Sequence, residues 1–185
     1  MPKQGATRLD LTRVTIEPFS DRAVVNRFSC GKRPLDSFLK NKAKKVVKRC
    51  EHRVFCAHLD GSPNVIGYYA LQLGNESVSE LPDARKDNHY LQNYVAFPAL
   101  NLSFVGVDSN YQRQGLGEHL LMDVFARVAA IAEHAGFYAL TLTSLDDDST
   151  AFYKSLNFAV YSAENARLPK MLYPLEDILT LMNAV

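Results

Sequence analysis

A short loop between two apolar stretches has the residue types of an anion-binding turn. The segment YQRQGLG, Tyr111 to Gly117, places two glycines where a helix is expected to begin. The first turn of a helix exposes unpaired N–H groups and the positive end of the helix dipole. Glycine lets an anion reach those groups because no side chain intervenes. The loop could therefore bind a phosphate group, although two glycines alone are more typical of a tight turn without a ligand.

The elements on either side of this loop would position it. The stretch ALNLSFVGV, residues 99–107, is predicted to be a strand that is buried on at least one face. Apolar residues recur at helical spacing from Leu116 to Ala135, which predicts a long helix. The loop is not a P-loop, because no Gly-Lys-Ser/Thr follows it, and it lacks the Gly-x-Gly-x-x-Gly spacing of a dinucleotide-binding turn.

Strands and helices alternate over the rest of the chain, which predicts an α/β fold. Pro34 fits the first turn of a helix that is expected to end at Val47. The sequence DGSPN separates two apolar runs and predicts a hairpin. Asp148 or Ser149 is expected to cap a short helix, STAFYKSLN, whereas residues 79–93 are expected to be irregular. The strands are expected at residues 11–16, 53–59, 65–73, 99–107 and 138–143, with a last pair around 158–162 and 170–173.

Composition narrows the class of protein. The chain has 185 residues, 47% of them hydrophobic and 22% charged, which suits one compact domain over residues 1–185. It has no apolar run long enough to span a bilayer, and its start lacks the apolar region of a signal peptide. Cys30, Cys50 and Cys56 are odd in number and have no metal-ligand spacing. We therefore expect reduced thiols, no metal and a cytoplasmic protein.

Positive charge is concentrated near the N-terminus. Residues 1–53 contain 14 Lys and Arg but only 5 Asp and Glu, whereas the remaining residues are net acidic. Much of this charge lies in a predicted helical segment at about residues 23–50. Two interpretations remain: a solvated helix face, which the sequence alone favours, or a surface that binds a polyanion. The candidate residues for such a surface are Lys40, Lys44, Lys45, Lys48 and Arg49, with Lys42 beside them.

Three motifs together resemble the GNAT family of N-acetyltransferases. QRQGLG fits the pattern Gln/Arg-x-x-Gly-x-Gly/Ala and resembles the loop by which that family binds the pyrophosphate of acetyl-CoA. SFVGVD resembles its central strand, and DSTAFYKSLNF resembles its A-x-x-FY-x-x-x-GF signature, with Asn157 where glycine is usual. The resemblance implies a mixed, mostly antiparallel twisted sheet with a splayed strand pair, flanked by helices. It places an acetyl-CoA-binding core at about residues 99–162.

The resemblance also implies a site. Tyr153 stands where the family commonly has the acid that protonates the departing thiolate. Its position in the motif favours this role over the alternative of a packing residue. A tyrosine hydroxyl with a pKa of about 10 is a plausible acid for a thiol with a pKa near 8.5. The base that deprotonates the amine is open among His89, Glu76 and a chain of waters. The implied cofactor-binding residues are Val105, Gly106, Val107, Gln112, Arg113, Gln114, Gly115, Leu116 and Gly117.

A further resemblance concerns the acceptor. FSCGKRPLDSFLKNKAKK resembles the F-x-C-G-x-x-x-L-D-x-F-L stretch of acetyltransferase toxins from bacterial type II toxin–antitoxin modules, and LPKMLYPLEDI resembles their closing strand and tail. Such toxins acetylate the amino group of aminoacyl-tRNA and pair with a small ribbon-helix-helix antitoxin. The basic residues would then hold tRNA, and a homodimer is also implied. Phe104 stands where these toxins often carry arginine.

Two other functions remain compatible with these motifs. One is an ordinary GNAT enzyme that acetylates a small-molecule or protein amine. The other is a non-catalytic module that binds acetyl-CoA.

Overall fold

The computed structural model describes residues 9–81, 91, 94–161 and 168–184. Their contacts divide the chain into two compact units. The first comprises Met1–Ala70 and Phe104–Val124, and the second comprises Leu71–Ser103 and Phe125–Val185. The single domain expected from composition stays a prediction.

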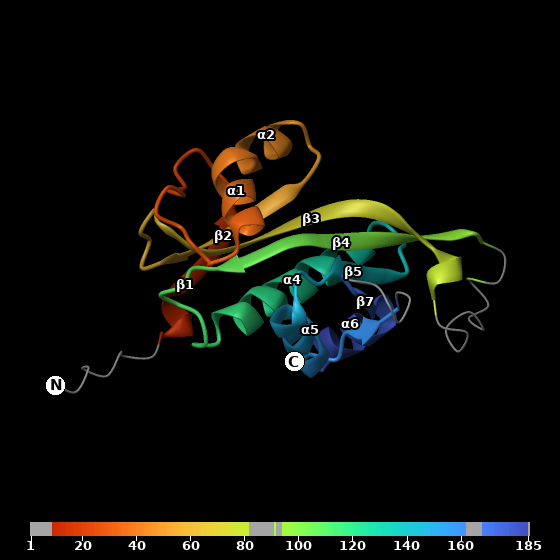
Figure 1. Ribbon diagram of the computed structural model, residues 1–185. Coiled ribbons are helices and arrows are strands. Elements are labelled where there is room, and N and C mark those ends of the chain that lie inside the picture. The colour runs from red at the N-terminus through yellow and green to blue at the C-terminus, as the bar shows by residue number, and fades with distance from the viewer. Residues whose placement is uncertain (1–8, 82–90, 92–93, 162–167, 185) are drawn as a thin grey trace. The chain divides into compact units, whose positions relative to one another are not determined.

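A mixed seven-stranded sheet has the order β1-β2-β3-β4-β5-β7-β6 (Figure 1). β1 pairs antiparallel with β2, and β7 pairs antiparallel with both β5 and β6, whereas β4 and β5 are parallel. This confirms the predicted mixed, mostly antiparallel sheet. The strands are β1 Val14–Pro18, β2 Arg53–Leu59, β3 Val65–Ser77, β4 Ala96–Val107, β5 Ala139–Thr143, β6 Ala159–Val160 and β7 Lys170–Pro174.

The parallel pair β4 and β5 separates early. The register of the pair runs from Ala99 opposite Ala139 to Asn101 opposite Thr141, although both strands continue beyond these residues. A short ladder between two longer strands is what the predicted splayed pair requires. The helices are α1 Arg33–Asn41, α2 Ala43–Lys48, α4 Leu116–Ala132, α5 Asp147–Ser155 and α6 Leu175–Asn183, with short 3-10 turns η1 Leu11–Arg13 and η2 Val78–Glu80.

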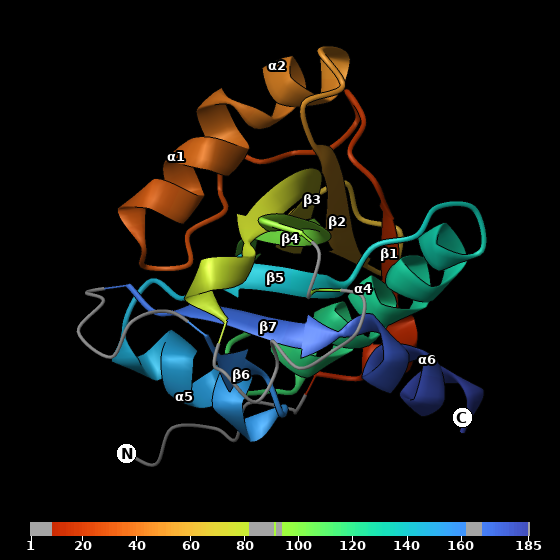
Figure 2. The ribbon, with the colours of Figure 1, turned by 90° about the vertical axis from the view of Figure 1, so that its right-hand side faces the viewer.

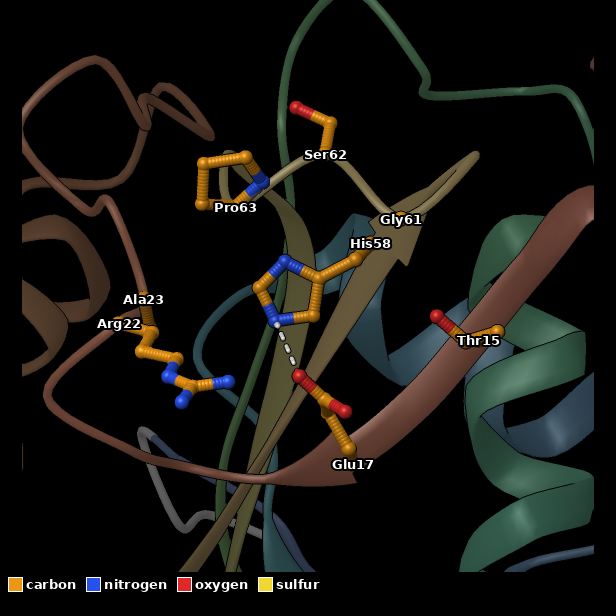
Figure 3. Close-up of a pocket in the computed structure, with 8 residues that line it drawn as sticks. All are labelled: Thr15, Glu17, Arg22, Ala23, His58, Gly61, Ser62 and Pro63. Carbon is orange, nitrogen blue, oxygen red and sulfur yellow. Dashed lines mark ion pairs between the residues drawn. The ribbon is translucent and has the colours of Figure 1, made fainter.

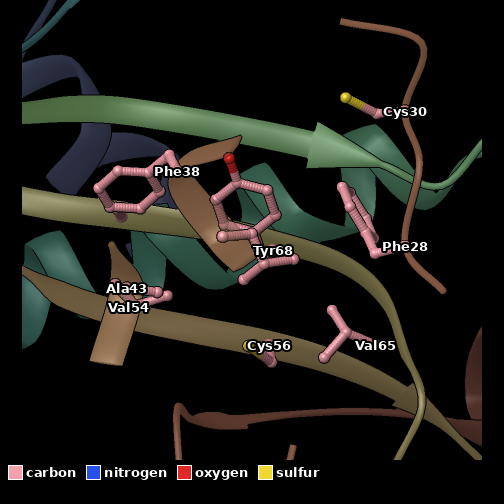
Figure 4. Close-up of a cluster of buried hydrophobic side chains, with 10 residues drawn as sticks. Phe28, Cys30, Phe38, Ala43, Val54, Cys56, Val65 and Tyr68 are labelled. Carbon is pink, nitrogen blue, oxygen red and sulfur yellow. The ribbon is translucent and has the colours of Figure 1, made fainter. Parts of the chain in front are cut away.

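In the first unit, helices cover both faces of the sheet. On one face, Phe38 of α1 and Ala43 of α2 join a buried cluster with Val54 and Tyr68 of the strands (Figure 4). On the other face, α4 comes so close to β3 that a Cβ on Gly67 would lie 3.1 Å from Leu120. The first unit is therefore a sheet packed between α1 and α2 on one side and the start of α4 on the other.

In the second unit, the core is built around β5 and β7. Phe97, Ala139 and Leu172 are buried in one cluster. A second group of rings joins Phe125 of α4 to Phe158 and Tyr173, with centroids 5.0 to 6.2 Å apart. Figure 2 shows β5 and β7 side by side, in agreement with their antiparallel register.

Three predicted elements were wrong in detail. The helix expected over residues 34–47 is two helices, because the backbone of Lys42, at φ −121°, ends α1 and begins α2. The strand expected from residue 11 starts only at Val14, since η1 occupies the residues before it. The cap of α5 is Asp146, whose carboxylate accepts a hydrogen bond from the Ser149 N–H at 2.9 Å.

The helix ends and the C-terminal segment also differ from expectation. α4 ends at Ala132 rather than Ala135, and β3 continues to Ser77. The helix α6 was not predicted, although LEDILTLMN buries Ile178 as an amphipathic helix would. By contrast, β2 has the predicted bounds, and most of the residues expected between 79 and 93 lie outside the described part of the chain.

Candidate functional site

The end of β4 is held by close packing at Gly106. A Cβ at this position would lie 2.8 Å from Cε1 of Tyr68 and 3.2 Å from Cζ of Phe28. Packing in the core of the first unit is therefore sufficient to require glycine here. Val105 and Val107 on either side are half-buried. The assignment of Val105, Gly106 and Val107 to cofactor binding concerns their backbone and stays a prediction.

Asp108 fixes the loop that follows β4. Its side chain is buried, and its carboxylate accepts hydrogen bonds from the Ser29 N–H at 2.9 Å and the Asn110 N–H at 3.0 Å. The Ser109 N–H in turn donates to the Ser29 carbonyl at 2.8 Å. Sequence analysis missed Asp108, although an aspartate two residues before an asparagine at the end of a strand is typical of such turns.

Two glutamine side chains hold the loop itself. Gln112 donates from Nε2 to the carbonyls of Cys30 and Val107, both at 2.9 Å. Gln114 accepts from the Leu9 N–H at 2.9 Å and donates to the Asn110 carbonyl at 2.9 Å. These side chains are engaged within the protein. If Gln112 and Gln114 bind the cofactor, they do so through their backbone N–H groups.

The loop turns into α4 through two residues in the left-handed region. Arg113 has φ 57° and Gly115 has φ 88°. The Gly115 carbonyl accepts the first helical hydrogen bond, from the His119 N–H at 3.0 Å. Leu116 is buried, whereas Arg113 is exposed and Gly117 lies in the first turn of α4. An anion could therefore reach the first N–H groups of α4, and Arg113 could add charge.

The segment FSCG packs directly against this loop. Asp36 of α1 accepts hydrogen bonds from the Cys30 N–H at 2.8 Å and the Ser29 hydroxyl at 3.3 Å. Phe28 is buried, and Gly31 has φ 80°. FSCG is part of the stretch that resembles the acetyltransferase toxins. In the structure it supports the loop after β4. Burial raises the pKa of the Cys30 thiol to about 11, so it stays protonated.

Tyr153 lies in α5, within the second unit. Its side chain is buried and packs edge-on against Phe158, with ring centroids 5.5 Å apart. The Phe152 ring is tilted against it, with centroids 5.3 Å apart. Burial raises the pKa of the Tyr153 hydroxyl, so the group is protonated at neutral pH and suits a proton donor rather than a base. Asn157 has φ 67°, the left-handed conformation that the usual glycine would adopt.

Of the two residues proposed as the base, the structure describes only Glu76. Glu76 forms an ion pair with Lys170, with Oε2 and Nζ 3.2 Å apart, so its carboxylate is engaged within the second unit. His89 lies outside the described residues. The base therefore stays open.

The candidate tRNA-binding residues are exposed on two helices. Lys40 lies in the last turn of α1, Lys44, Lys45 and Lys48 belong to α2, and Arg49 follows α2. Lys44 pairs with Asp21 at 2.8 Å, but the two side chains are 74% and 77% exposed. Arg49 lies 3.6 Å from Glu51. Exposed pairs of this kind contribute little free energy, and the surface keeps an excess of positive charge.

A separate polar pocket lies elsewhere in the first unit (Figure 3). It has a volume of about 210 Å³. The buried His58 ring has Nδ1 3.2 Å from the Asn64 carbonyl and Nε2 3.9 Å from a Glu17 oxygen. None of the predicted site residues lines this pocket. Its lining residues are Thr15, Glu17, Arg22, Ala23, His58, Gly61, Ser62 and Pro63.

The described part of the chain lacks two kinds of feature. No cluster of three or more His, Cys, Asp or Glu side chains there could hold a metal ion. No helix in the described ranges combines the length and the apolar composition needed to cross a bilayer.

Known proteins resemble this chain over most of its length. The acetyltransferase (GNAT) family model matches residues 20–158. The probable toxin TacT of Sinorhizobium fredii (strain NBRC 101917 / NGR234) is 32% identical over 179 residues, covering 90% of this chain and 94% of TacT.

Two solved proteins have the same fold. A KacT mutant with tyrosine replaced by phenylalanine has a TM-score of 0.84 and 28% identity, covering 91% of this chain and 99% of KacT. AtaT complexed with acetyl-methionyl-tRNAfMet has a TM-score of 0.81 and 25% identity, covering 91% of this chain and 99% of AtaT. The KacTA–DNA complex also matches, with 26% identity and a TM-score of 0.75, covering 93% of this chain and 99% of the matched chain. AtaTR bound with AcCoA matches with 25% identity and a TM-score of 0.79, covering 92% of this chain and 99% of the matched chain.

These matches confirm the resemblance to acetyltransferase toxins and set aside the non-catalytic alternative. This chain belongs to the acetyltransferase (GNAT) family and is an acetyl-CoA-dependent N-acetyltransferase.

Proposed function

We propose that this enzyme acetylates the amino group of an aminoacyl-tRNA in the cytoplasm and thereby stops translation as a toxin. The observation that carries the proposal is the match to AtaT, which was solved with acetyl-methionyl-tRNAfMet and aligns with 91% of this chain. TacT, the curated relative, is named a probable toxin. The exposed basic residues of α1 and α2 supply the charge that a tRNA backbone requires.

The reaction assigns a role to each predicted element. The loop from Gln112 to Gly117 holds the pyrophosphate of acetyl-CoA through backbone N–H groups. A backbone N–H of Val105 to Val107 stabilises the oxyanion that forms when the amine attacks the thioester carbonyl. The C–N bond forms, the C–S bond breaks, and the amine loses a proton to a base or to water. Tyr153 donates its proton to the departing sulfur and regains one from solvent.

The proposal includes a protein partner. KacT was solved as a KacTA–DNA complex, so a relative of this enzyme belongs to an assembly that contacts DNA. We propose a small ribbon-helix-helix antitoxin as the DNA-binding partner of this enzyme. The homodimer implied by the resemblance stays a prediction.

One observation favours a second function. Phe104 stands where the toxins often carry arginine, and its ring is stacked on Phe38 rather than directed at a charged ligand. An ordinary GNAT enzyme that acetylates a small-molecule amine would have no need of a cation there.

Mass analysis of tRNA ends separates the two functions. The enzyme would be expressed from a tightly controlled promoter, and the aminoacyl ends of cellular tRNA would be analysed for an added acetyl group, with the Tyr153→Phe variant as control. The proposed function expects acetylated ends with the parent enzyme and far fewer with the variant. Unmodified ends, from an enzyme that acetylates a small test amine, would leave the second function in its place.

A further inference from the structure

Three rings of the first unit form one aromatic cluster. Phe38 of α1 and Phe104 of β4 are stacked, with centroids 3.7 Å apart and planes inclined by 13°. His52, between α2 and β2, contacts both. Its centroid lies 5.7 Å from that of Phe38 and 6.1 Å from that of Phe104, at angles of 62° and 52°. The imidazole thus lies at the side of the stack, where the two phenyl rings present their edges.

The two nitrogens of His52 have different environments. Nδ1 is buried and has no hydrogen-bond partner, and it is the one buried side-chain nitrogen or oxygen in this condition among the described residues. Nε2 is not in this condition, and the His52 side chain as a whole is only half-buried, so Nε2 is the more accessible of the two nitrogens. His52 therefore has one inaccessible nitrogen and one available nitrogen.

This asymmetry fixes what the ring can do. Protonating His52 would place a second N–H at Nδ1, where no acceptor exists, and burial lowers the pKa of the ring accordingly. His52 is therefore a poor base for the acceptor amine. In the neutral ring, a buried lone pair at Nδ1 is better tolerated than a buried N–H, because orphaned N–H groups are the rarer case and the phenyl edges are positive. Nε2 then carries the hydrogen and is a neutral donor.

The position of this donor relates it to the acceptor. Phe104, which the imidazole contacts, directly precedes the segment of β4 proposed to hold the thioester. Arg49, the last of the candidate tRNA-binding residues, comes three residues before His52. Cations suit phosphate oxygens, whereas a neutral N–H suits an uncharged oxygen such as those of an ester or a ribose.

We propose that His52 binds the aminoacyl end of the acceptor, with Nε2 donating a hydrogen bond to an ester or ribose oxygen there. Phe104 is then a positioning residue, because its stack with Phe38 holds the imidazole. This proposal rests on the proposed function. It also gives a use to the phenylalanine that replaces the arginine of the resembled toxins.

Steady-state kinetics on two variants test the proposal. His52→Phe keeps a ring beside the stack and removes the N–H, whereas His52→Gln keeps an N–H donor. We expect KM for aminoacyl-tRNA to rise about 3- to 10-fold in His52→Phe, the usual worth of one hydrogen bond, and to return at least halfway on a logarithmic scale in His52→Gln. The KM for acetyl-CoA should stay within about twofold, since His52 is not proposed to touch that substrate. An unchanged KM for aminoacyl-tRNA in His52→Phe, or an equal rise in both variants, overturns the proposal.

The parent enzyme separates this proposal from the proposed function. If the parent fails to acetylate aminoacyl-tRNA, the proposed function fails and the role of His52 falls with it. If the parent is active and His52→Phe is unaffected, only the role of His52 fails. A measurement on the parent does not depend on any variant: the ¹⁵N shifts of the His52 ring should show a neutral Nε2–H tautomer at pH 7, and the Nδ1–H tautomer overturns the proposal.

Discussion

The two units position their candidate residues by different means. In the first unit, the loop after β4 is held by polar side chains: Asp108, Gln112 and Gln114 hydrogen-bond to backbone groups up to 105 residues away. In the second unit, Tyr153 is held by ring packing against Phe152 and Phe158.

The difference suits what each region is proposed to supply. An anion site needs unpaired N–H groups that face solvent, so the side chains around it must shape the backbone without occupying those groups. A proton donor needs a neutral hydroxyl, and burial among rings keeps it neutral. The following variants test whether this division holds.

The largest effect is expected at Tyr153. Tyr153→Phe removes one hydroxyl and keeps the ring contacts, so kcat should fall by roughly 10²- to 10⁴-fold while acetyl-CoA affinity barely changes. Steady-state kinetics and calorimetry measure the two quantities. Tyr173→Phe, which removes another hydroxyl from the aromatic group of the second unit, is the matched control and should stay within a few-fold. A similarly small loss for Tyr153→Phe would make Tyr153 a packing residue.

The next effect is expected at Gly115 in the loop. Gly115→Val places a branched side chain at φ 88°, where a Cβ would lie 3.3 Å from Leu11, and should weaken acetyl-CoA binding at least about tenfold. Gly61→Val is the control, because Gly61 also has a positive φ of 69° but belongs to the turn after β2. Both variants should lose stability, and calorimetry should show lower affinity only for Gly115→Val. Equal affinities in the two would contradict the loop assignment.

A smaller effect on stability is expected at Gly106. Gly106→Ala forces a methyl group to within 2.8 Å of the Tyr68 ring, whose hydroxyl is anchored to the Leu35 carbonyl at 2.9 Å. The unfolding free energy should fall by about 1–3 kcal/mol, the cost of overpacking a core. Gly74→Ala on β3 meets nothing within 4 Å and should be close to neutral. Denaturant titrations compare the two, and equal stabilities would mean that this part of the first unit is not tightly packed.

The smallest effect is expected on the basic surface. Lys45→Glu should weaken tRNA binding and reduce the slope of log affinity against log salt by about one unit for each phosphate group that the variant no longer binds. Lys154→Glu on α5 of the second unit makes the same charge change and should leave that slope unaltered. Filter binding across a salt series provides the measurement. Equal slopes for both variants would remove the basic helices from the proposed tRNA site.

Local patterns in the sequence were sufficient for much of this molecule. The bounds of β2 follow from an apolar run, the start of α4 at Leu116 follows from helical spacing, and the turn at Asn157 follows from a residue that tolerates a positive φ. The loop was recognisable for the same reason, since its glycines and its flanking elements lie within a few residues of one another. The family followed from these short motifs, and the comparisons confirmed it.

Only the tertiary structure decided how distant segments complete the site. The sequence predicted one helix through Lys42, whereas the structure has two helices that meet there and bury Phe38 and Ala43 in one cluster. Nothing near Asp108 in the sequence indicates that its carboxylate holds the N–H of Ser29, and nothing near His52 indicates the stack of Phe38 and Phe104. The physical reason is that a helix or a turn depends on neighbours within a few residues. A buried hydrogen bond or a ring stack depends instead on which segments the fold brings together.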